Sequence, residues 1–93
     1  MFRRILQRMR DKIRRRQYVV TYHARKEMND DGFTIYDVEC GILTGTIVER
    51  QRDRTTGEAK YRMRGNTLDG SEVEVLTKLS PTGKLVIITV YRP

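Results

Sequence analysis

The hydrophobic period of this chain changes at Gly45, and this change constrains the fold more than any other feature. Before Gly45, apolar residues recur at spacings of three and four, which is typical of amphipathic helices. After it, apolar and polar residues alternate in four segments separated by turns. These segments are residues 46–52, 59–68, 71–79 and 84–92. Asp69 and Gly70 are a strong two-residue hairpin signal, so the second half is predicted to be an antiparallel meander.

The first half is predicted to supply a basic amphipathic helix, a short strand and two short helices. In order, they cover residues 2–16, 17–22, 23–31 and about 34–43. Gly32 is placed to end one short helix, and Thr34 with Asp37 forms a capping box that begins the next. The final strand is apolar on both faces, which predicts a central position. The predicted fold is α+β, with short helices packed on one face of a mostly antiparallel sheet of about five strands.

The charge of the chain is also unevenly divided. The sequence has 19 basic and 12 acidic residues, a net charge of +7. Residues 1–16 contain eight of the bases and one of the acids, so residues 17–93 contain eleven of each. We therefore divide the chain into a basic helical arm, residues 1–16, and a single neutral domain, residues 17–93. The arm suits RNA, the ribosome or an acidic protein, and its expected nucleic-acid contacts are Arg14, Arg15 and Arg16.

The arm also has an apolar stripe that needs a covering surface. That surface is either the chain's own sheet or a partner, and a homodimer through this helix is one such arrangement. The stripe consists of Phe2, Leu6, Met9 and Ile13.

Composition excludes several classes of protein. The single cysteine, Cys40, allows no disulfide within the chain and no cysteine-based zinc cluster. His23 is the one histidine and no cysteine stands at helical ligand spacing from it, which argues against a metal site. No apolar run approaches the ~20 residues of a membrane span. We expect a cytoplasmic protein without a membrane segment, metal or cofactor.

Two residues are candidates for proton transfer. His23 lies at the predicted junction of strand and helix, where the helix-terminal amides disfavour imidazolium. It is either a neutral general base or a structural residue that packs against the sheet. Tyr91 ends the apolar run of the last strand and precedes Arg92. It either stacks on a base and orients a phosphate, or it completes a core strand.

Three cations alternate along the segment 59–68. Period two places Lys60, Arg62 and Arg64 on one sheet face about 7 Å apart, which matches successive phosphates of a single strand. The alternative is an ordinary solvated hairpin, on which Glu72 and Glu74 are cross-strand partners of these cations. Cations of later strands that extend the row are Lys78 and Arg92.

Several motifs resemble a known bacterial family. They are Thr21-Tyr-His23-Ala24, then Gly32-Phe-Thr34 with Asp37-Val38, then Gly45-Thr-Ile47, and the closing run from Leu85 to Tyr91. In these motifs the chain resembles the family called domain of unknown function 4258, over about residues 17–92. The basic arm lies outside the resemblance.

This resemblance implies a RelE/ParE-like fold, the fold of many toxins of bacterial toxin–antitoxin pairs. It also implies a cognate antitoxin encoded nearby, often one with a zinc-finger motif. In RNA-cleaving relatives of that fold, cations of the central strands and a tyrosine near the C-terminus surround the scissile phosphate. Positions of matching type and location are Lys60, Arg62, Arg64, Lys78, Tyr91 and Arg92.

Two functions are therefore expected as alternatives. The first is a toxin that acts as a metal-independent endoribonuclease, in which a 2′-hydroxyl attacks its own 3′-phosphate. His23 or Tyr91 would relay the proton, while the cations of residues 60–64 stabilise the developing charge. The second is a non-catalytic module of the same fold that binds a protein or a nucleic acid.

Overall fold

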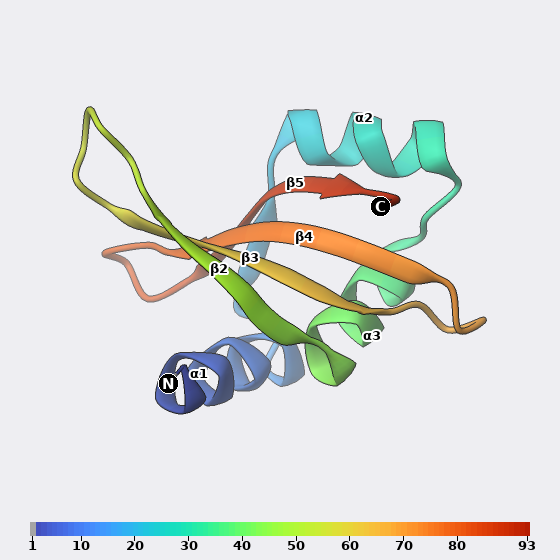
Figure 1. Ribbon diagram of the computed structural model, residues 1–93, viewed down its shortest axis with the longest axis horizontal. Helices are drawn as coiled ribbons and strands as arrows, with labels where there is room; N and C mark the ends of the chain where they lie inside the picture. Colours follow the sequence, from blue (N-terminus) through green and yellow to red (C-terminus); the bar gives the residue numbers. More distant parts are fainter. Residues whose placement is uncertain (1) are drawn as a thin grey trace.

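The computed structural model describes residues 2–93 (Figure 1). Its elements are α1 (Arg3–Arg14), β1 (Tyr18–Val20), α2 (Tyr22–Asp31), α3 (Ile35–Thr44), β2 (Thr46–Arg52), β3 (Ala59–Asn66), β4 (Glu72–Leu79) and β5 (Leu85–Tyr91). The α+β class predicted from the sequence is confirmed, with three helices and one sheet of five strands.

The strands lie in the order β1-β5-β4-β3-β2. Strands β2 to β5 form the predicted antiparallel meander, and β1 joins β5 in parallel. The apolar β5 is an interior strand, between β1 and β4, and not an edge strand, which agrees with the prediction from its sequence. The turn between β3 and β4 is wider than the expected two-residue hairpin, because the Thr67 amide donates to the Ser71 carbonyl oxygen and leaves residues 68–70 between them. Within it, the carboxylate of Asp69 accepts a hydrogen bond from the Ser71 amide. The paired residues nearest this turn are Asn66 and Glu72.

Local signals in the sequence explain where the short helices begin and end. Thr21 is the N-cap of α2 and accepts a hydrogen bond from the Ala24 amide, so α2 begins one residue earlier than predicted. Gly32 follows α2 in the left-handed conformation, with φ of 75°. The predicted capping box of Thr34 and Asp37 is present at the start of α3.

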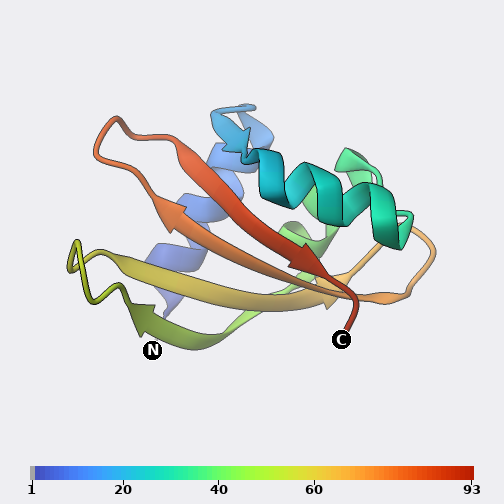
Figure 2. The same ribbon diagram turned by 90° about the horizontal axis from the view of Figure 1, so that it is seen from above.

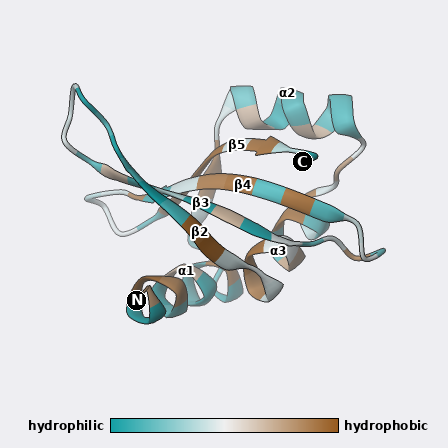
Figure 3. Cartoon of the chain, viewed as in Figure 1, coloured by the Kyte–Doolittle hydropathy of each residue, from teal (hydrophilic) through white to brown (hydrophobic). Residues whose placement is uncertain are grey.

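The three helices lie on one side of the sheet (Figure 2). Alternate strand residues face them, and the hydropathy of β4 alternates accordingly (Figure 3). Met63, Val75 and Ile87 are at most 1% exposed and form the core with residues of all three helices. We call the opposite side of the sheet, which no helix covers, the open face.

Part of the apolar stripe of α1 packs into the chain's own core. Met9 is fully buried and Ile13 is 3% exposed. Arg10 adds a hydrogen bond from Nη2 to the carbonyl oxygen of Gly45 at 2.8 Å. Met9 and Ile13 are therefore unavailable to a second copy of the chain. Within residues 2–93, no helix is long and apolar enough to cross a membrane.

Candidate functional site

Four polar side chains from three strands meet at the centre of the open face. Arg64 and Tyr91 stand opposite Glu74 in the two strands that flank β4. Arg62 lies on the same face, two residues before Arg64. Glu74 is only 2% exposed although no helix covers this face, because the other three side chains surround it. We call these four residues the Glu74 cluster.

The carboxylate of Glu74 accepts four hydrogen bonds. Arg62 Nη1 donates to Oε1 at 2.7 Å, and the Tyr91 hydroxyl donates to the same oxygen at 2.5 Å. Arg64 donates to Oε2 from Nε and Nη2, at 2.9 and 2.6 Å. Arg62 also donates from Nε to Glu49 Oε1 at 3.1 Å. Arg62 Nη2 and Arg64 Nη1 have no hydrogen-bond partner within residues 2–93.

These contacts set the acid–base properties of the cluster. Burial alone would raise the pKa of Glu74, but hydrogen bonds from Tyr91, Arg62 and Arg64 outweigh it and lower the pKa to about 2. The pKa of Tyr91 is raised because its hydroxyl donates to that carboxylate and is partly buried. A general base works best with a pKa near the operating pH. The cluster thus holds two guanidinium groups side by side but provides no base suited to neutral pH.

The other predicted catalytic residues lie apart from the Glu74 cluster. His23 is on α2, with 67% of its side chain exposed, and its Nε2 is 3.2 Å from Glu27 Oε1. Glu27 in turn accepts the backbone N–H of Val90, so it joins α2 to β5. Lys60 lies on the open face but pairs with Asp53, at 3.1 Å.

The two cations predicted to extend the row, Lys78 and Arg92, contact neighbours other than the Glu74 cluster. Lys78 pairs with Glu58 at 3.4 Å. Arg92 lies over the ring of Phe33 at 4.6 Å and donates to the Asp31 carbonyl, so it contacts the segment at the end of α2 rather than the cluster. Cross-strand acids were the alternative interpretation of this hairpin, and Glu74 has that role.

The outer face of α1 is also positively charged. Sequence reasoning selected only Arg14, Arg15 and Arg16, although the helical spacing of the other arginines could have indicated the rest. Arg14 pairs with Asp11 at 3.3 Å, and both side chains are exposed. The exposed arginines of this helix and its end are Arg3, Arg4, Arg8, Arg14, Arg15 and Arg16.

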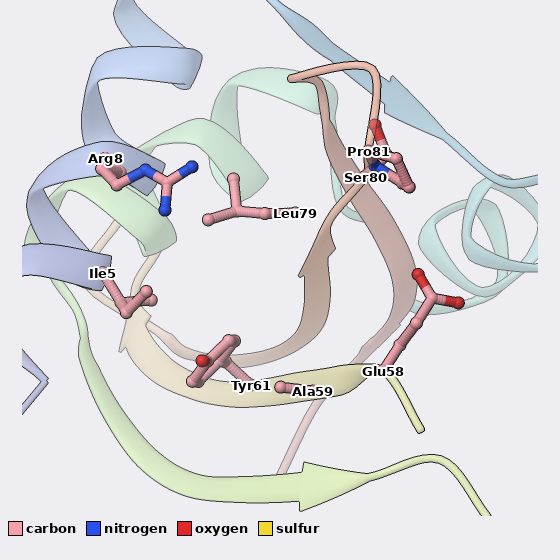
Figure 4. A pocket seen from close by; sticks show the side chains of 8 residues that line it. All are labelled: Ile5, Arg8, Glu58, Ala59, Tyr61, Leu79, Ser80 and Pro81. Carbon is pink, nitrogen blue, oxygen red and sulfur yellow. The ribbon is translucent and has the colours of Figure 1, made fainter. Parts of the chain in front are cut away.

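A groove of about 380 Å³ runs between α1 and the hairpin of β3 and β4 (Figure 4). Ile5, Tyr61 and Leu79 form its apolar walls, and Arg8 and Glu58 lie at opposite sides. It is lined by both signs of charge. Within residues 2–93, no group of three or more histidine, cysteine or acidic residues could hold a metal ion.

The comparisons with known proteins agree with the sequence resemblance. The family model described as "Domain of unknown function (DUF4258)" matches residues 20–92, which include α2, α3 and strands β2 to β5. Searches of curated proteins and of solved structures found no match. The matched region contains the whole Glu74 cluster but excludes α1. Because it covers most of the sequence, this chain belongs to the DUF4258 family.

Proposed function

We propose that this protein is a nucleic-acid-binding module of RelE/ParE-like fold, and that RNA binds along the exposed arginines of α1. One observation carries this proposal: four of the five cations predicted to bind phosphate on the sheet pair with acids, whereas most of the exposed arginines on α1 do not. The fifth, Arg92, contacts Phe33 and the Asp31 carbonyl oxygen. Only Arg14 of the exposed α1 arginines pairs with an acid within residues 2–93.

The two surfaces differ in what a phosphate must displace. On the open face it must compete with the buried carboxylate of Glu74 for Arg62 and Arg64. Separating a buried ion pair is costly because it leaves a charge without its partner. On α1 a phosphate displaces only water and mobile counterions, and counterion release favours binding. Charge therefore directs RNA to α1.

The family resemblance supports a biological setting for this module. We propose that it is the toxin component of a bacterial toxin–antitoxin pair and that it works in the cytoplasm. The cognate antitoxin, of a type that includes zinc-finger proteins, would control its access to RNA or the ribosome.

An endoribonuclease is the second candidate, and the convergence of Arg62, Arg64 and Tyr91 favours it. Each arginine keeps one terminal nitrogen free for a phosphate, and Tyr91 is held protonated, as a proton donor must be. This candidate takes second place because Glu74, with a pKa of about 2, is a weak base at neutral pH.

RNA binding and RNA cleavage can be tested with the same protein. We expect a fluorescent 20-nucleotide RNA to bind with an affinity that falls steeply with salt, by a logarithmic slope of about −0.7 for each phosphate contacted. Arg3→Gln combined with Arg4→Gln and Arg8→Gln should weaken binding and make this slope shallower by about 2, or about 0.7 for each arginine removed. Arg64→Gln, checked for folding by circular dichroism, should leave it unchanged.

The opposite pattern would reject the proposal. Binding that survives the triple α1 variant but is lost in Arg64→Gln would locate RNA at the Glu74 cluster. Cleavage of RNA by the wild type, abolished by Arg64→Gln, would establish the endoribonuclease instead.

A further inference from the structure

We propose that α1 recognises single-stranded rather than duplex RNA and holds one nucleobase in a second groove, between α1 and the beginning of β2. This inference rests on the proposed function and specifies the form of RNA that the arginines bind. The groove has a volume of about 420 Å³, within the range of roughly 300–1,000 Å³ typical of small-ligand sites.

The lining of this groove combines the groups that a nucleobase contacts. Phe2, Leu6 and Ile47 provide apolar surface, including one aromatic ring. Gln7 and Thr46 provide an amide and a hydroxyl that can donate or accept hydrogen bonds at a base edge. Proteins bind unpaired bases by this combination of apolar or aromatic contact and polar edge contacts.

The charge of the groove selects it over its neighbour. Arg3 and Arg10 line it, and no acid does. The groove of Figure 4, on the other side of α1, has the carboxylate of Glu58 opposite Arg8. A nucleotide brings a phosphate and electron-rich base edges, so it is repelled by the acid in one groove and attracted by both arginines in the other.

Arg10 adds a second positive charge that is held in place beside the groove. Its Nη2 donates to the Gly45 carbonyl, which fixes the guanidinium beside the groove. Its Nε is buried and has no hydrogen-bond partner within residues 2–93. A buried donor without an acceptor is unusual in a folded protein. A base edge or phosphate in the groove would place acceptors next to this guanidinium.

The preference for single-stranded RNA follows from the position of the groove beside the arginines of α1. The exposed arginines of α1 contact phosphates of any nucleic acid. Insertion of a base between α1 and β2 requires a base that is not paired and stacked in a duplex. A single strand can contact both the arginines and the groove, whereas a duplex contacts the arginines alone.

The test compares two RNA probes by fluorescence anisotropy at one salt concentration: an unstructured 12-nucleotide RNA and a duplex of the same length. We expect the wild type to bind the single strand about tenfold more tightly, the order of effect of one stacked base. Gln7→Phe fills the groove without changing charge, and it should remove this preference while leaving duplex binding unchanged.

Adjacent arginines provide a matched control. Arg3 and Arg4 are both exposed, but only Arg3 lines the groove. We expect Arg3→Gln to weaken single-strand binding several-fold more than Arg4→Gln, and the two to weaken duplex binding equally. Melting curves should show that all three variants fold.

Any other outcome would reject the proposal that this groove binds a nucleobase. Equal binding of both probes, with Arg3→Gln equal to Arg4→Gln, would reject it and leave the charge-directed RNA module in place. Binding of neither probe would reject both. Tight binding of a labelled polyglutamate peptide, without a preference for single-stranded RNA, would assign the groove to an acidic protein.

Discussion

Replacing Glu74 by glutamine tests the account of the open face most directly. The substitution keeps the size of the side chain but removes the negative charge to which Arg62, Arg64 and Tyr91 all donate. It also places an amide NH₂ against guanidinium groups that cannot accept a hydrogen bond. We expect Glu74→Gln to lower the free energy of unfolding by about 3 kcal/mol at pH 7.

The size of this effect comes from the pKa of Glu74. Its ordinary value of 4.5 falls to about 2 in the folded protein, and each unit corresponds to about 1.4 kcal/mol. Because the folded pKa is the lower one, this stability is fully present above pH ~4.5 and is lost as the pH falls towards 2. At pH 3 about 1 kcal/mol remains. The stability difference between wild type and variant should therefore shrink by about 2 kcal/mol from pH 7 to pH 3.

The assay is urea unfolding followed by circular dichroism at both pH values. Other acids with lowered pKa, such as Asp53 and Asp69, titrate in both proteins and cancel in the difference. Glu72→Gln is the control, because Glu72 is exposed on the same strand, and its effect should stay within about 0.5 kcal/mol. A Glu74→Gln variant as stable as this control, or a deficit that does not change with pH, would refute the reasoning.

Three further predictions concern the core. Met9→Ala should lower the free energy of unfolding by about 2–5 kcal/mol in urea titrations, because Met9 is fully buried; a change below 1 kcal/mol would contradict this. Deletion of residues 1–16 should abolish the cooperative melting transition, whereas a sharp transition would show that residues 17–93 fold alone. Gly65→Ala should be more destabilising than Gly41→Ala in thermal melts. A Cβ at Gly65 meets the backbone of Gly41, whereas one at Gly41 meets only a methyl group of Val73.

The sequence predicted the strands well because their signals are local. Alternation located β2 to its exact bounds, and the two-sided apolar sequence of β5 placed it inside the sheet. The Glu74 cluster could be predicted only in part. Alternation and the hairpin indicate that Glu74 lies near Arg64. The position of Tyr91 depends on the register of β4 against β5, which contains an irregularity between Leu76 and Thr77 that no local signal announces.

Local sequence signals also could not predict which surface the apolar stripe of α1 packs against. Spacing identified the apolar stripe, but the same stripe fits a partner or the chain's own core. That choice depends on the space left beside α3, which only the complete packing defines. The boundary between the arm and the domain at residue 16 is based on the distribution of charge. Packing does not follow that boundary, because Met9 and Ile13 of the arm are buried in the core.

The burial of α1 connects the fold to the proposed binding surface. A helix of twelve residues with like charges four apart, such as Arg4 and Arg8, is unstable in isolation. Its helical structure therefore depends on the burial of Met9 and Ile13 in the core. The family match begins at residue 20, so the matched region is less than the folded unit in this chain. Because the arginines repel one another in the folded state, an anionic ligand that neutralises them stabilises the helix, and through Met9 and Ile13 it stabilises the sheet.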